Sequence, residues 1–107
     1  MSSGIIGGNM FAICAVSATV DVASVSAATT SDQSFTVPGV LLGDIVVVIP
    51  ASTLNTGLAV SHAIVTGTDT VSIRFLNATA GALNPASATY TFLVFRPESI
   101  AGRVTTG

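Results

Sequence analysis

Residues 70–76 read TVSIRFL, and this stretch decides the fold class. Val71, Ile73 and Phe75 alternate with polar residues, which is the pattern of a strand with one buried face and one face in water. Val, Ile, Ser and Thr are abundant elsewhere, and no segment has the mixture of Glu, Lys and Leu that is typical of a surface helix. We therefore expect an all-β chain.

Turn residues divide the chain into seven candidate strands. Pro38-Gly39, Gly43-Asp44 and Gly67-Thr68-Asp69 are typical turn sequences. The candidate strands span residues 10–16, 19–27, 34–37, 44–49, 58–66, 70–76 and 88–96. Short strands at this density are typical of a β-sandwich or a small barrel.

The length of the chain is that of one domain. In 107 residues we find no internal repeat and no linker between domains. We expect a single small antiparallel β-sandwich or barrel-like domain over residues 17–107. Residues 1–16 are expected to form an extended N-terminal arm, in 1–9, and the first strand.

Charge is scarce in this chain. Charged residues make up 7% of the sequence, compared with about 25% in a typical soluble domain. The hydrophobic fraction is 50% and the mean hydropathy is +0.80. A transmembrane helix needs roughly 20 consecutive apolar residues, and Gly, Pro, Ser, Thr and Asn interrupt the best uncharged windows, so we expect no contact with a membrane. Much of the apolar surface is instead expected to contact other protein.

Some apolar residues exceed what a two-layer domain can bury, because such a domain covers one face of each sheet. The segment 45–49 is apolar on both faces, and the last strand gains a second apolar row at 93–95. These rows are candidates for subunit contact, unless the segment 10–16 covers them within the same chain. The candidate interface residues are Ile5, Ile6, Met10, Phe11, Ile13, Val46, Val48, Leu93 and Phe95.

The sequence predicts no enzyme, no cofactor and no metal site. The lone His62 is expected to be a hydrogen-bonded core or interface histidine, and no second His or pair of Cys completes a zinc site. Asp44 and Asp69 most simply cap turns through their side-chain oxygens. Cys14 lies in an apolar stretch and is expected to be a small buried residue. The three arginines are widely separated and the net charge is −2, which argues against direct binding to nucleic acid.

Short motifs follow one another in a distinctive order between residues 21 and 97. A strand ending in Phe-Thr-Val precedes a Gly-rich turn, a Gly-Asp pair leads into a hydrophobic strand, and an Asp-Thr pair opens the alternating strand. The matching positions are Phe35, Thr36, Val37, Gly43, Asp44, Gly57, Asp69, Thr70, Asn77, Thr79, Pro85, Tyr90 and Arg96. This order resembles a group of small structural proteins of tailed bacteriophages, which includes capsid decoration, or cement, proteins.

The resemblance implies a non-enzymatic virion protein that stabilises the capsid by binding the major capsid protein across neighbouring subunits. Members of the group dock on assembled heads, often as trimers, so a homo-oligomer is expected, with a trimer favoured. The expected location is the capsid surface, after synthesis in the cytoplasm of the host bacterium. The arm at 1–9 could add a strand to a neighbour's sheet edge. The alternative is a tail or fibre domain that binds a receptor or carbohydrate, although the chain has no Trp and one Tyr with which to build an aromatic platform.

Overall fold

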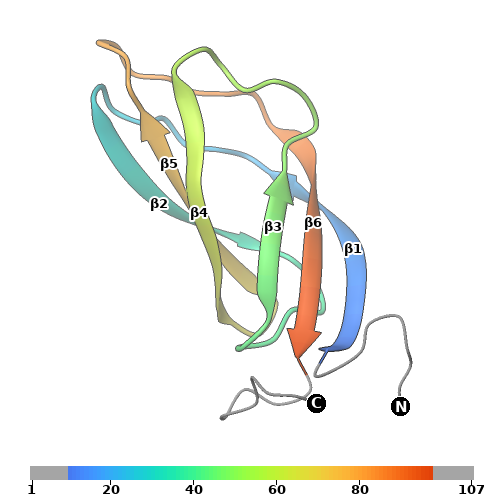
Figure 1. Cartoon of the computed structure of the whole chain (residues 1–107). Helices are drawn as coiled ribbons and strands as arrows, with labels where there is room; N and C mark the ends of the chain where they lie inside the picture. The colour runs from blue at the N-terminus through green and yellow to red at the C-terminus, as the bar shows by residue number, and fades with distance from the viewer. Residues whose placement is uncertain (1–9, 98–107) are drawn as a thin grey trace.

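The computed structural model describes residues 10–97 of the chain. These residues form six strands and no helix (Figure 1). The strands are β1 (Met10–Val20), β2 (Thr29–Thr36), β3 (Ile45–Ile49), β4 (Leu58–Gly67), β5 (Thr70–Asn77) and β6 (Ala88–Pro97). The expected all-β class is therefore confirmed.

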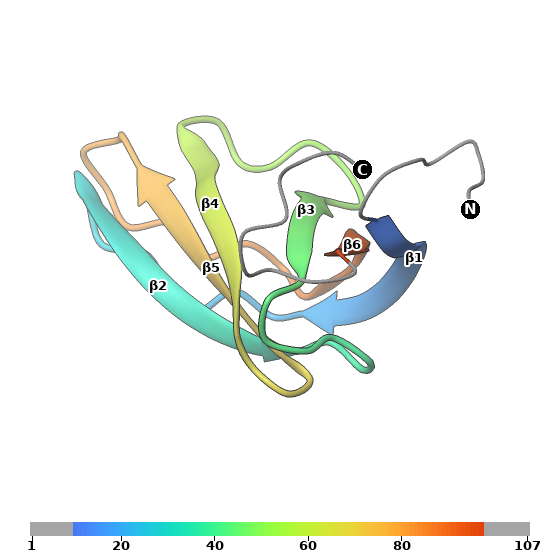
Figure 2. The same cartoon turned by 60° about the horizontal axis from the view of Figure 1, so that its bottom comes forward.

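The strands form two antiparallel sheets of three strands each. The order is β1-β6-β3 in the first sheet and β2-β5-β4 in the second. The two sheets form separate layers, with the apolar core between them (Figure 2). This arrangement confirms the prediction of a small antiparallel β-sandwich.

The core is built by the alternating residues of the central strands, because successive side chains of a strand point to opposite faces. Val71, Ile73 and Phe75 of β5 have no exposed surface, as the sequence pattern predicts. Phe92 of β6 is equally buried and Tyr90 is nearly so. Each sheet therefore has one face in the core and one face outside it.

The N-terminal part of the chain differs from the prediction of strands at 10–16 and 19–27. A single strand, β1, continues to Val20, because no Gly, Pro or charged residue interrupts it. Residues 21–28 are not a strand but a loop, apart from one bridge between Val25 and Leu83. This loop buries Val22 and Val25, which are three residues apart, rather than alternate residues. The expected boundary between residues 16 and 17 falls within β1.

Strand β2 begins at Thr29, five residues earlier than the predicted start at 34. Its register places Ser31, Gln33 and Phe35 opposite the core residues of β5. Only one of these three is apolar, so β2 has no hydrophobic alternation from which it could be recognised. The remaining four strands lie within one or two residues of their predicted bounds.

Asn77 joins the loops at one end of the sandwich. Its side chain is fully buried, and its Nδ2 donates hydrogen bonds to the carbonyl oxygens of Val25 and Gly81, both at 2.9 Å. Its Oδ1 accepts a hydrogen bond from the backbone N–H of Thr79 at 2.8 Å. A buried amide needs such partners, so Asn77 fixes three chain segments at once. Glycosylation of Asn77, the formal Asn-Ala-Thr acceptor, is incompatible with this burial.

Candidate interaction surface

The outer face of the β1-β6-β3 sheet is uncharged and largely apolar. Residues directly opposite one another in an antiparallel sheet share a face. The register aligns three rows across the three strands: Ile13–Phe95–Ile45, Ala15–Leu93–Val47 and Ser17–Thr91–Ile49. We call these nine residues the apolar face. Four of its aliphatic side chains, those of Ile13, Ile45, Val47 and Ile49, are 45–53% exposed, and none of the nine residues is charged.

The structure places Ile13, Leu93 and Phe95 on this face, in agreement with their selection from the sequence. Val46 and Val48, by contrast, point inward and pack against the core. They lie opposite the core residues Val94 and Phe92 of β6. Because both rows of β3 are apolar, the sequence did not reveal which row would be exposed. The exposed row consists of Ile45, Val47 and Ile49.

The other selected residues belong to the N-terminal segment. Ile5 and Ile6 lie outside the described residues, and only the strand backbone is described for Met10 and Phe11. The remainder of β1 lies beside β6 in the plane of the sheet (Figure 1). Residues 12–16 therefore extend the apolar face and do not cover it.

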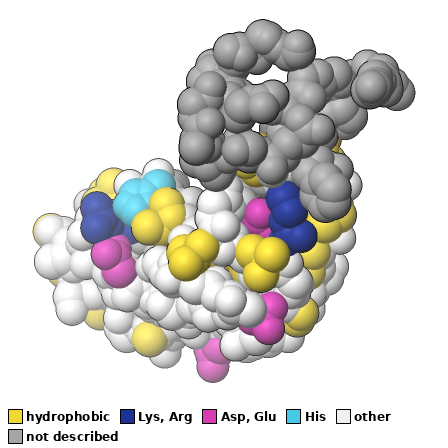
Figure 3. All heavy atoms as spheres, turned by 90° about the horizontal axis from the view of Figure 1, so that it is seen from below, with side chains coloured by type: hydrophobic (Ala, Val, Ile, Leu, Met, Phe, Trp, Pro, Cys, Tyr) yellow, Lys and Arg dark blue, Asp and Glu magenta, His cyan; other side chains and the backbone are white. Residues whose placement is uncertain are grey.

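The outer face of the β2-β5-β4 sheet is more polar. Arg74 at its centre donates two hydrogen bonds to Asp32, from Nε to Oδ1 at 2.6 Å and from Nη2 to Oδ2 at 2.9 Å. This guanidinium holds the pKa of the Asp32 carboxyl below its ordinary value. The histidine lies next to this pair (Figure 3). The two outer faces of the sandwich thus differ in chemistry.

His62 is exposed, so the prediction that it lies in the core is wrong, whereas the alternative of an interface histidine stays a prediction. The prediction assumed a regular strand, in which His62 shares a face with Leu58 and Val60. The register of β4 shifts between Val60 and His62. Such an irregularity changes which residues face the core. After it Ala63 and Val65 face inward, and His62 lies opposite Arg74 on the outer face.

A second ion pair holds the loop between β2 and β3. Arg96 donates hydrogen bonds to both carboxylate oxygens of Asp44, at 2.9 and 2.7 Å, and to the carbonyl oxygen of Gly39 at 2.8 Å. Asp44 Oδ2 also accepts the N–H of Leu41 at 3.0 Å, which confirms its predicted role in the turn. The Asp44 side chain is only 2% exposed, and Arg96 holds its pKa below the ordinary value.

Asp69 ties a second turn to the same loop. Its Oδ1 accepts the N–H of Gly39 at 2.8 Å, and its own N–H donates to the carbonyl oxygen of Val40 at 2.9 Å. The predicted structural role of Asp69 is thus confirmed, although its partners lie in another turn. Together, Asp44, Asp69 and Arg96 fix a loop whose Leu42 is 70% exposed. The pairing of Asp44 with Arg96 was not foreseen, because 52 residues separate them.

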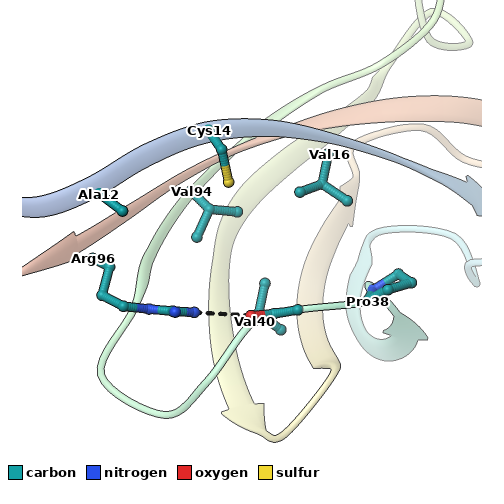
Figure 4. Close-up of a pocket in the computed structure, with 8 residues that line it drawn as sticks. Ala12, Cys14, Val16, Pro38, Val40, Val94 and Arg96 are labelled. Atoms are coloured by element: carbon teal, nitrogen blue, oxygen red, sulfur yellow. Dashed lines mark hydrogen bonds between the residues drawn. The ribbon is translucent and has the colours of Figure 1, made fainter.

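A cavity of about 130 Å³ lies on the inner side of β1. Its wall comprises Ala12, Cys14, Val16, Pro38, Gly39, Val40, Val94 and Arg96. In Figure 4 the Cys14 side chain points from β1 toward this space. Cys14 is exposed, so the prediction that it is buried is wrong. Although its side chain is on the inner side, β1 is at the edge of the sheet and only partly covered.

The described residues contain neither a cluster of metal ligands nor a membrane-spanning helix. Within residues 10–97, no three His, Cys, Asp or Glu side chains lie close enough together to hold a metal ion. No described segment is a helix that could cross a membrane.

Comparisons with known proteins identify no relative. No protein-family model matches the sequence, and neither the curated proteins nor the solved structures include a significant match.

Proposed function

We propose that the protein is a non-enzymatic virion component that decorates a bacteriophage capsid and binds the major capsid protein across neighbouring subunits. The observation that supports this most is the apolar face, with nine uncharged residues on a sheet of three strands. Contiguous exposed apolar surface is typical of sites that contact other proteins. The resemblance of residues 21–97 to phage structural proteins suggests the kind of assembly.

Such a protein acts through binding free energy alone. A copy that bridges two capsid subunits adds its own binding free energy to the cost of separating them, and many copies act together by multivalency. With 7% charged residues, the chain has little means of long-range electrostatic steering.

We infer that the protein is a homo-oligomer, with a trimer favoured by the resemblance. Burial of apolar surface contributes about 25 cal/mol per Å², so contact between such faces needs no ion pair. Sedimentation equilibrium tests this with two matched variants. Ile45 on the apolar face is 53% exposed and Ile64 on the opposite sheet is 52% exposed. Ile45→Asp should dissociate the oligomer and Ile64→Asp should not. A wild-type protein that is only monomeric at micromolar concentration contradicts the inference.

The location of the protein in the virion distinguishes the proposed function from its alternative, a receptor- or carbohydrate-binding tail domain. A label at the C-terminus can be located by negative-stain imaging of virions of the phage that encodes the chain. The proposal predicts label distributed over the head. Label at the tail tip or on fibres favours the alternative instead.

A further inference from the structure

A groove of about 330 Å³ lies between two loop segments at one end of the sandwich. One wall is formed by residues 51–55 of the loop between β3 and β4, and the other by the segment 85–88 that leads into β6 (Figure 1). Small-molecule sites have volumes of about 300–1,000 Å³, so the groove has room for one small ligand. None of its lining residues is charged, and none belongs to the apolar face. The groove is therefore a separate candidate site.

Tyr90 contributes to this groove although most of its side chain belongs to the core. The residue is only 2% exposed, and burial raises the pKa of its hydroxyl, which therefore stays protonated at neutral pH. Within residues 10–97 this hydroxyl makes no hydrogen bond to protein, yet no fully buried side-chain oxygen of that region lacks a partner. The hydroxyl is thus at the surface of the groove. A tyrosine this buried usually has a hydrogen-bond partner, so Tyr90 offers a donor and an acceptor to a bound molecule.

Other polar side chains line the same groove. They are exposed, and none of them hydrogen-bonds to another described residue: Ser52, Thr53, Asn55 and Ser87. Hydroxyls and amides can both donate and accept hydrogen bonds. No Lys or Arg lines the groove to pair with a phosphate or a carboxylate. This chemistry suits a neutral ligand that carries several hydroxyls.

Aliphatic groups complete the two walls. Leu54 on one wall is partly buried and packs against the core, and Pro85 on the other wall is buried. A pyranose ring has C–H groups on its faces and hydroxyls around its edge, so it can contact both kinds of surface. Because the ring of Tyr90 lies in the core, it cannot serve as a stacking platform. Leu54 and Pro85 supply the apolar contacts in its place.

Backbone hydrogen bonds hold both walls. The carbonyl oxygen of Gly57 accepts the N–H of Ala78 at 2.9 Å, next to the first wall. Next to the second wall, the backbone groups of Val25 and Leu83 exchange two hydrogen bonds at 2.8 and 3.0 Å. Walls fixed in advance lower the entropy cost of binding. Residues 51–55 and 85–87 are not strands, so the groove does not offer a sheet edge to an extended peptide.

We propose that this groove binds one neutral pyranose, with the Tyr90 hydroxyl bonded to a sugar hydroxyl and a C–H face of the ring against Leu54 and Pro85. The sugar can be free or a residue of a glycan, because both present the same ring and hydroxyls. Sugar binding is independent of the proposed function, since no groove residue is on the apolar face.

Nuclear magnetic resonance titration of the full chain tests the site. The methyl glycosides of glucose, galactose, mannose and N-acetylglucosamine, and the corresponding free sugars, are added at millimolar concentration to isotope-labelled protein. At least one of them should shift the amide signals of residues 51–55 and 86–88 and leave those of β5 unchanged. Binding of the methyl glycoside assigns a residue of a glycan, and binding of the free form alone assigns a free sugar. No shift in the groove with any of these sugars, or shifts only with glucuronate or inorganic phosphate, overturns the proposal.

Tyr90→Phe removes the hydroxyl and keeps the ring in the core. The variant should keep the melting temperature of the wild type, because the hydroxyl has no protein partner, and should weaken sugar binding roughly threefold to tenfold. Ser87→Ala should also weaken binding, whereas Ser61→Ala is the matched control at an exposed serine outside the groove and should bind as the wild type does. Equal binding by Tyr90→Phe and the wild type overturns the proposal. A marked loss of stability in Tyr90→Phe overturns it too, because the hydroxyl would then be bonded to protein.

Discussion

Replacement of Asn77 by Ala tests how the loops of the sandwich are held. The variant removes two hydrogen bonds donated to Val25 and Gly81 and two accepted from Thr79, from its backbone N–H and its hydroxyl. A hydrogen bond contributes about 1 kcal/mol to stability, and a buried polar group left unpaired costs more. The free energy of unfolding should therefore fall by about 3–4 kcal/mol, which is a large part of the roughly 5–15 kcal/mol of a typical domain. The melting temperature should fall by roughly 10–20 °C.

Urea denaturation followed by circular dichroism measures this change directly, and Asn84→Ala is a matched control. Asn84 is exposed, so its replacement should change the free energy of unfolding by less than about 0.5 kcal/mol. Equal stability of Asn77→Ala and the wild type would refute the reasoning that this amide fixes three segments. A similar loss in both variants would also refute it, because the effect would then not depend on burial.

Three further perturbations follow from the turns and ion pairs. Gly57 has φ +88°, and a side chain there would meet Cγ2 of Thr79. Gly57→Ala should therefore lower the free energy of unfolding by at least about 1 kcal/mol, measured by thermal unfolding. Gly81 has open space around it, so Gly81→Ala is the control and should not lower it. Because Arg96 lowers the folded-state pKa of Asp44, this group stabilises the fold above its unfolded pKa of about 3.9, and the contribution is lost as the pH falls through the folded-state value. Melting temperatures measured across that range should therefore depend less on pH in Asp44→Asn than in the wild type, and equal dependence contradicts the role of Asp44. His62→Ala should leave both the melting temperature and head binding unchanged, since His62 is exposed; loss of binding without loss of stability would indicate a functional role for it.

The sequence predicted the fold class because β5, and β6 from Thr89 to Phe92, follow strict alternation. Val71, Ile73 and Phe75 are buried as that pattern requires. Strand β2 was largely missed because its inward positions include Ser31 and Gln33, which hydrophobic periodicity does not detect. The prediction that His62 faces the core was wrong because no residue type marks the irregularity in β4.

The candidate surface was predicted in part. The excess of apolar residues at 45–49 and 93–95 correctly indicated an apolar outer face, which no other strand within residues 10–97 covers. Which row of β3 is exposed depends on its register with β6, and that register pairs Val47 with Leu93. Long-range contacts such as Asp44 with Arg96 are set by the sheet topology, which local patterns do not specify.

Binding to capsids tests the central proposal most directly. Heads stripped of this component are mixed with wild type, Ile45→Asp or Ile64→Asp, sedimented, and then heated while DNA release is measured. The wild type and Ile64→Asp should co-sediment with heads and raise the temperature of DNA release. Ile45→Asp should be folded but remain in the supernatant and give no protection. Equal binding of all three proteins contradicts the assignment of the apolar face, and no binding of the wild type to heads contradicts the proposed function itself.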